Sequence, residues 1–147
     1  MNGLIEFLKA CPEDTKVYLG SDSERVRSKG KSYANYTVAA VVHIGGKHGG
    51  KIFSKTTREP VYDSKLSQPR LRLMTEVYKV AEVYLELVDK INFPIEVHLD
   101  INPDEAFGSS CVVSEAIGYI RGTCNVIPLV KPKAWAASTV ADRWKSG

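Results

Sequence analysis

The sequence of 147 residues has only three cysteines, no Cys-x-x-Cys pair and no apolar run long enough to cross a membrane. Cys11, Cys111 and Cys124 are odd in number and widely spaced, which argues against a disulfide framework and against paired-cysteine zinc sites. A membrane-spanning helix needs about 20 apolar residues, and a secretory signal places an apolar segment after a basic one. Because neither pattern occurs, we expect a cytoplasmic protein with reduced cysteines and no membrane partner.

Neither sign of charge dominates, since 20 Lys and Arg stand against 17 Asp and Glu. The glycine-rich stretch 45–50 lacks the Gly-x-x-x-x-Gly-Lys-Ser/Thr spacing of a phosphate-binding loop, so it is expected to be a hairpin loop. The apolar fraction of 44% and the charged fraction of 25% are those of an ordinary globular protein. We therefore predict one domain over residues 1–147, in which 1–12 form an N-terminal helical extension.

Hydrophobic periodicity predicts the order of the elements. The expected elements are a short helix within 1–12, a strand from 16 that ends at Asp22, a polar loop to about Tyr33, strands over 36–44 and 51–57, a helix from 68 to about 90, a strand over 95–101, a helix over 110–121, a strand over 125–130 and a helix over 134–145. Three antiparallel strands followed by alternating helix and strand predict an α/β fold. We expect a five-stranded mixed sheet with helices on both faces.

Asp22 and Asp100 each end an apolar strand, and we expect these two strands to lie side by side and parallel. Two adjacent carboxylates at the rim of a sheet are suitable ligands for Mg²⁺, which prefers hard oxygen atoms. The alternative for Asp22 is a turn residue that bonds its own backbone. Glu76 in the first long helix and Asp142 in the last helix are placed to join the pair. On the helix alone a solvent-facing Glu76, paired with nearby bases, is the more typical interpretation, and only the whole set of four acids favours a site.

Basic residues follow the first acidic segment and recur near the C-terminus. The candidates for nucleic-acid contact are Arg25, Arg27, Lys29, Lys31, Lys131 and Lys133. Basic residues that flank an acidic centre match the needs of a phosphate-backbone substrate.

The ordered set of motifs resembles the ribonuclease H fold, from Val17 onward. The motifs that carry the resemblance are Gly20-Ser21-Asp22-Ser23, Arg72-x-x-x-Glu76, His98-Leu99-Asp100-Ile101 and Ala141-Asp142-Arg143. Within that superfamily the sequence looks most like the YkuK-like group of ribonuclease H-related proteins. Glu76 sits about two turns into its helix, deeper than the corresponding acid of ribonuclease H, so Glu82 stays open as an alternative.

The resemblance implies a nuclease that hydrolyses phosphodiester bonds with two Mg²⁺ or Mn²⁺ ions. Asp22 would bridge both ions, Asp100 and Glu76 would complete the site of the ion that activates water, and Asp142 would complete the other. Crowded carboxylates raise one another's pKa, so they stay ionised together only with cations among them. By analogy, Lys131 and Lys133 would take the place of a basic residue that aids product release.

Two alternatives remain open at the level of sequence. Asp22-Ser23-Glu24 matches the first motif of proofreading-type 3′–5′ exonucleases, but Ser138 and Ala137 stand where those enzymes carry Tyr or His. A non-catalytic module that binds nucleic acid or protein would keep the fold without the chemistry. The substrate (RNA, DNA or hybrid) and the oligomeric state are left open.

Overall fold

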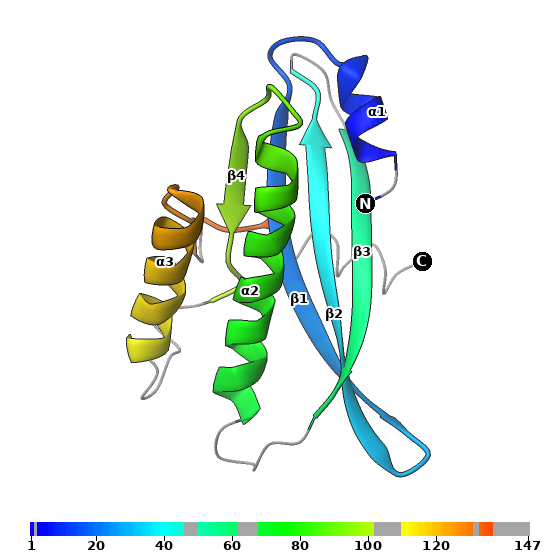
Figure 1. Cartoon of the computed structure of the whole chain (residues 1–147), viewed down its shortest axis with the longest axis vertical. Coiled ribbons are helices and arrows are strands. Elements are labelled where there is room, and N and C mark those ends of the chain that lie inside the picture. Colours follow the sequence, from blue (N-terminus) through cyan, green and yellow to red (C-terminus); the bar gives the residue numbers. More distant parts are fainter. Residues whose placement is uncertain (2, 46–49, 62–67, 102–109, 131–132, 137–147) are drawn as a thin grey trace.

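A computed structural model describes residues 1, 3–45, 50–61, 68–101, 110–130 and 133–136. Within these residues, seven elements follow one another along the chain (Figure 1). They are α1 (Leu4–Lys9), β1 (Lys16–Ser28), β2 (Lys31–His43), β3 (Gly50–Pro60), α2 (Gln68–Val88), β4 (Ile95–His98) and α3 (Ser110–Cys124). The order of these seven elements agrees with the first seven elements that the periodicity predicts.

The described residues form one mixed sheet of four strands in the order β3-β2-β1-β4. The pairs β3-β2 and β2-β1 are antiparallel, and β1 runs parallel to β4, as predicted. The prediction of a fifth strand over 125–130 is wrong, because this segment makes only a single parallel bridge between His98 and Leu129. Pro128 has no N–H to donate, which limits the ladder that this segment can form.

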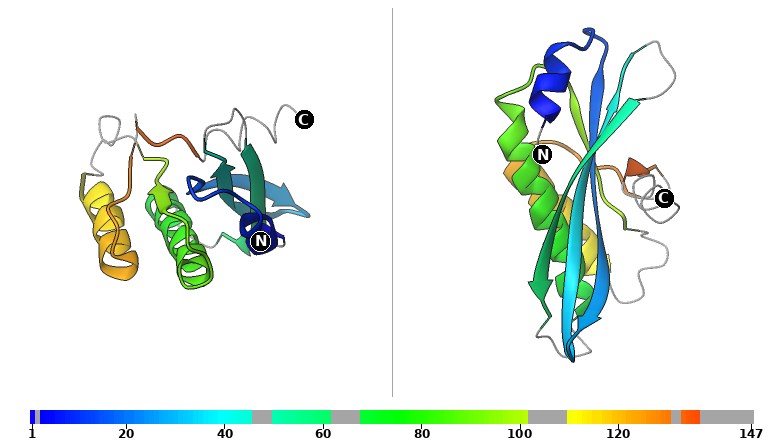
Figure 2. Two further views of the ribbon diagram at one scale, coloured as in Figure 1. Left: turned by 90° about the horizontal axis from the view of Figure 1, so that it is seen from above. Right: turned by 90° about the vertical axis from the view of Figure 1, so that its right-hand side faces the viewer.

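The three described helices cover one face of the sheet (Figure 2). α2 packs against β1, β2 and β4, and α3 lies beside α2. The main core between helices and sheet contains Leu19 of β1, Met74 and Val80 of α2 and Ile120 of α3, all at most 2% exposed. On the opposite face a smaller cluster joins Ala39 and Val41 to Ala136. Of the helix predicted over 134–145, the structure describes residues 134–136, and only residue 136 is helical. The prediction of helices on both faces of the sheet is therefore confirmed for one face.

β1 is longer than the sequence predicts, and Asp22 lies in its middle. The strand continues to Ser28, and a two-residue turn then leads directly into β2. The polar loop expected up to Tyr33 is therefore a hairpin, whose outer residues 27–32 extend past the end of β3 (Figure 1). Cross-strand pairing with β2 outweighs the low strand propensity of Gly20 and Ser21. None of the described helices is both long and apolar enough to span a bilayer.

The backbone conformation of this hairpin turn predicts that replacing its glycine will lower the stability of the fold. Lys29 and Gly30 have φ values of 52° and 77°, the left-handed pair of a tight hairpin turn. No atom lies within 4 Å of a Cβ added at Gly30, so Gly30→Ala is strained by its backbone conformation alone. We expect Gly30→Ala to lower the free energy of unfolding by about 1 kcal/mol in urea denaturation.

Gly118 provides the matched control, because it lies in α3 and a Cβ there also meets open space. Gly118→Ala should raise the free energy of unfolding by roughly 0.5–1 kcal/mol, since alanine favours helix more than glycine does. Equal shifts in the same direction for both variants would contradict the left-handed turn.

Candidate functional site

Asp22 and Asp100 lie where two parallel strands separate. β4 ends at His98, whose partner on β1 is Gly20. Asp100 follows two residues after this last pair on one chain segment, and Asp22 two residues after it on the other. Both side chains are half-buried. The structure thus brings together the two aspartates that the sequence analysis placed at neighbouring strand ends, although for Asp22 the strand itself continues.

Glu76 lies on α2 against the helix-covered face of β1 and is tied to this strand by two serines. Ser23 Oγ donates a hydrogen bond of 2.6 Å to Glu76 Oε2, and Ser21 Oγ donates one of 2.9 Å to the Glu76 backbone carbonyl. Ser21 and Ser23 both face the helix because side chains two residues apart share one face of a strand. Sequence reasoning missed the role of these hydroxyls, although their spacing around Asp22 was a usable signal.

The charge of Glu76 is costly in this environment. Its side chain is only 9% exposed, and burial raises its pKa from the ordinary 4.5 to about 8. The hydrogen bond from Ser23 opposes this rise, whereas the negative charges of Asp22 and Asp100 add to it. The charges of the two aspartates therefore reach Glu76, although Asp22 alternates with Ser21 and Ser23 and so lies on the face of β1 that is turned away from α2.

Glu82 is placed differently from Glu76. It is exposed on α2 and lines a small open pocket together with Lys55 and Lys79. Asp22 and Asp100 act on the pKa of Glu76, whose side chain is held against β1. Of the two helix acids that the sequence left open, Glu76 is thus the one on which the charges of the two aspartates act.

The ligand set for a metal ion is incomplete in the part of the chain that the structure describes. Among those residues, no three His, Cys, Asp or Glu side chains group closely enough to hold an ion by themselves. Asp142, the fourth predicted acid, lies outside the described residues, as does Lys131. The chemistry of the donor set nevertheless suits a hard divalent cation, because Glu76, Asp22 and Asp100 bring oxygen ligands and mutually unfavourable charge.

The first group of predicted basic residues lies on the hairpin between β1 and β2, not in a loop. We call Arg25, Arg27, Lys29 and Lys31 the basic hairpin; all four are exposed. Arg25 follows Asp22 by three residues of extended strand, a rise of about 10 Å. Lys133, from the second basic group, is also exposed.

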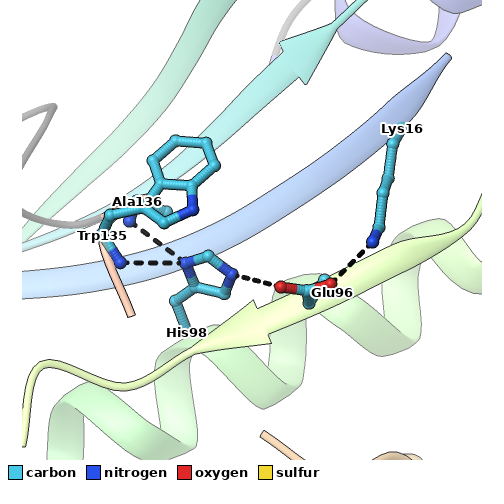
Figure 3. Close-up of polar contacts among 5 residues, drawn as sticks. All are labelled: Lys16, Glu96, His98, Trp135 and Ala136. Carbon is cyan, nitrogen blue, oxygen red and sulfur yellow. Dashed lines mark hydrogen bonds and ion pairs between the residues drawn. The ribbon is translucent and has the colours of Figure 1, made fainter. Parts of the chain in front are cut away.

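A buried histidine connects β4 with the residues that enter the C-terminal segment (Figure 3). His98 is fully buried, and its Nδ1 accepts the backbone N–H groups of Trp135 at 3.1 Å and Ala136 at 3.2 Å. Because Nδ1 acts as an acceptor, Nε2 carries the proton and donates to Glu96 Oε1 at 2.7 Å. The contact between His98 and Glu96 is thus a hydrogen bond of a neutral imidazole. The sequence analysis had treated His98 only as a strand or core residue.

Glu96 continues the chain of contacts to Lys16 on β1. Its Oε2 lies 2.7 Å from Lys16 Nζ. Burial pushes the pKa of Glu96 upward, but the hydrogen bonds from Lys16 and His98 outweigh it and leave the pKa below its ordinary value. The hydrogen bond to Glu96 in turn raises the pKa of Lys16, against a smaller effect of burial. The alternation Glu96-Val97-His98 places both polar side chains on one face of β4, which is the signal in the sequence.

The mixed four-stranded sheet with helices packed against it defines an α/β protein. Two of its acids lie where β1 and β4 separate, and a third lies on α2. A family model described as ribonuclease H-like matches residues 1–146, and the chain belongs to this family. The finer likeness to the YkuK-like group stays a prediction. Family membership supports a nuclease-like function.

Among solved structures, the crystal structure of NurA is similar to this chain, with 17% sequence identity and a TM-score of 0.29, over 74% of this chain and 24% of NurA. The chain therefore spans about a quarter of the length of that protein. The search of curated proteins found no match.

Proposed function

We propose that this chain is a nuclease that hydrolyses phosphodiester bonds with two Mg²⁺ or Mn²⁺ ions. The observation that carries the proposal is the buried carboxyl group of Glu76, which accepts the hydrogen bond of Ser23 and whose pKa is raised to about 8, chiefly by burial and further by the charges of Asp22 and Asp100. Acidic side chains whose pKa values are shifted this far by burial and by neighbouring charges are characteristic of functional sites. Membership in the ribonuclease H-like family supports the same function.

Four carboxylates would hold the ions in this proposal: Asp22, Glu76, Asp100 and Asp142. The carboxylate oxygens of the described part of the set suit divalent cations, because a positive charge nearby would offset both the burial and the repulsion that raise the pKa of Glu76. When bound, the ions would lower the pKa of an attacking water and stabilise the charge on the leaving oxygen.

The chain itself supplies the orientation of these groups. Ser23 holds the Glu76 carboxylate toward β1, and Ser21 fixes the turn of α2 that carries it. The bond from Ser23 restricts the rotamers of a side chain that must otherwise be ordered when an ion binds, and the bond from Ser21 fixes the backbone beneath it. The basic hairpin would bind the phosphate backbone of the nucleic acid, beginning about 10 Å from Asp22.

A non-catalytic nucleic-acid-binding module is the second candidate. The observation in its favour is that the described residues do not by themselves assemble three metal ligands. This module would use the basic hairpin and leave the acids without a catalytic role. The two candidates differ in whether a divalent ion produces cleavage.

A cleavage assay distinguishes them. End-labelled single strands, duplexes, junctions and RNA–DNA hybrids would be incubated with the chain in Mn²⁺, in Mg²⁺ and in EDTA. We expect metal-dependent cleavage of at least one substrate above the background of the Asp100→Asn variant. Binding to the same substrates without cleavage above that background would favour the binding module.

The basic hairpin predicts a salt-dependent affinity for nucleic acid. Removing one cation that binds a phosphate makes the slope of log K against log salt shallower by about 0.7–0.9. The double variant Arg25→Ala, Arg27→Ala should therefore reduce this slope by roughly 1.5 and weaken binding most at low salt. Fluorescence anisotropy with a labelled single strand between low and moderate ionic strength measures both quantities.

The matched control removes two exposed cations elsewhere, Lys90 beyond the end of α2 and Arg121 on α3. It changes net charge by the same amount but should leave the slope unchanged. A flat salt response of the wild-type chain would contradict a role of the basic hairpin in phosphate binding.

A further inference from the structure

We propose that Tyr33 and Arg58 form a stacking site for the unpaired bases of a single-stranded nucleic acid, on the same face of the sheet as Asp22. We call these two side chains the stacking pair; their contact and their place on the sheet come from described residues. The proposal deepens the proposed function by naming the substrate class, and it rests on that function only for the role of Asp22.

The register of the sheet places the stacking pair and Asp22 on one face. Directly paired residues of neighbouring strands share a face, and so do residues two apart on one strand. Asp22 pairs with Thr37, and Tyr33 lies four residues from Thr37 on β2. Arg58 lies two residues from Thr56, which pairs with Thr37 and contacts it through the two hydroxyl groups at 2.9 Å. Four residues of strand rise by about 13 Å, so Tyr33 lies roughly this far along the sheet from Asp22.

This part of the sheet face is open to solvent. Asp22 alternates with Ser23, which faces α2, so the face of Asp22 is turned away from that helix. Arg58 is exposed and Tyr33 is partly exposed. Tyr33 lies level with the last residue of β3, where the hairpin of β1 and β2 begins to project (Figure 1). A strand of nucleic acid can therefore reach the stacking pair from solvent.

The stacking pair combines an aromatic ring with an oriented positive charge. The guanidinium carbon of Arg58 lies 5.7 Å from the centre of the Tyr33 ring. Arg58 Nε donates a hydrogen bond of 2.9 Å to Asn35 Oδ1, which restricts the orientation of the guanidinium plane. Aromatic rings and guanidinium planes both stack on bases, and a guanidinium group also binds phosphate. One nucleotide can thus be bound here through its base and its phosphate.

The charge around the stacking pair suits a nucleic-acid strand. The four cations of the basic hairpin and Arg58 stand against the carboxylates of Glu24 and Glu59. Glu59 is engaged by Lys79, with 3.1 Å between Oε2 and Nζ. The excess of positive charge attracts phosphates whichever bases they carry. Stacking adds the requirement that a base face be accessible, which unpaired bases meet and bases inside a duplex do not.

Binding without metal tests the stacking pair separately from catalysis. A labelled oligothymidine strand, an abasic strand of the same length and a blunt duplex would each be titrated with the chain in EDTA. We expect wild type to bind oligothymidine at least about fivefold more tightly than the abasic strand, the lower limit for one stacked base. Tyr33→Leu should weaken binding of oligothymidine by at least about fivefold and leave binding of the abasic strand and the duplex nearly unchanged. Tyr33→Phe, which keeps the ring, should bind all three as wild type does.

Tyr78→Leu is the matched control, because Tyr78 is an exposed tyrosine on α2, on the other side of the sheet. It should leave all three affinities unchanged. If Tyr33→Leu weakened binding of oligothymidine and of the abasic strand equally, or weakened neither, the stacking pair would be overturned.

The cleavage assay in Mn²⁺ separates this inference from the proposed function. Metal-dependent cleavage without the contrast between oligothymidine and the abasic strand would retain the nuclease and overturn the stacking pair. The same contrast without cleavage of any substrate would retain the stacking pair and overturn the nuclease.

Discussion

The Glu76→Gln variant should be more stable than the wild-type chain at pH 9 and equally stable near pH 4, both without metal. Burial raises the pKa of Glu76 from 4.5 to about 8, so the folded chain holds a proton that the unfolded chain has already lost. The stability that this proton supplies is fully present below pH 4.5 and is lost as the pH rises through about 8. A shift of this size corresponds to about 5 kcal/mol.

Glutamine has the size of glutamate and can still accept the hydrogen bond from Ser23, but it does not ionise. The free energy of unfolding, from urea titrations at a series of pH values, should therefore decline less for Glu76→Gln than for wild type between pH 5 and 9. Mn²⁺ at pH 8 should stabilise the wild-type chain and leave Glu76→Gln nearly unaffected, because binding to the folded state alone shifts the equilibrium.

Glu82→Gln is the matched control, since it makes the same chemical change on an exposed position of the same helix. Its pH dependence should follow that of wild type. If the free energy of unfolding fell in parallel with pH for all three proteins, Glu76 would not be the group whose buried charge destabilises the fold.

The second large effect that we expect is a loss of hydrolytic activity in the Asp22→Asn variant. If the chain is a metal-dependent nuclease, removal of the carboxylate proposed to bridge both ions should lower kcat by at least about 100-fold, the usual cost of one group that stabilises transition-state charge. KM for the nucleic acid should change little, because the basic hairpin is intact. Single-turnover cleavage in Mn²⁺ measures the rate, and calorimetry measures the loss of ion binding.

Asp22→Asn should also lower the pKa of Glu76, because the charge of Asp22 contributes to its rise. This second readout does not depend on catalysis. Asp89→Asn, an exposed aspartate just beyond the end of α2, is the control with the same change of charge. Equal Mn²⁺-dependent rates for Asp22→Asn and wild type would remove Asp22 from the site.

The alternation and periodicity of apolar residues were sufficient to predict most elements. The helix over 68–88 and the strand at 95–98 follow from such local patterns. The continuation of β1 through Asp22 could not be predicted in this way, because pairing with β2 stabilises residues whose own propensity for strand is low. The segment 125–130 shows the opposite case, in which an apolar pattern lacks the partners for a ladder.

For the candidate site, the sequence alone identified the acids, and the structure decided how they relate. Asp22, Glu76 and Asp100 stand out in sequence as carboxylates beside apolar elements, yet the sequence favoured Glu76 without excluding Glu82. Only the hydrogen bond from Ser23, 53 positions away in sequence, and the charges of the two aspartates separate them.

The sequence by itself determined the succession of helices and strands, the parallel neighbours β1 and β4, and the identity of the acidic candidates, because these depend on local propensity and hydrophobic spacing. The tertiary structure alone decided the number of strands, the burial that raises the pKa of Glu76 and the contact of His98 with Trp135 and Ala136. Desolvation and hydrogen bonding between residues distant in sequence depend on which groups the folded chain brings into contact, and no local pattern of residues contains that information.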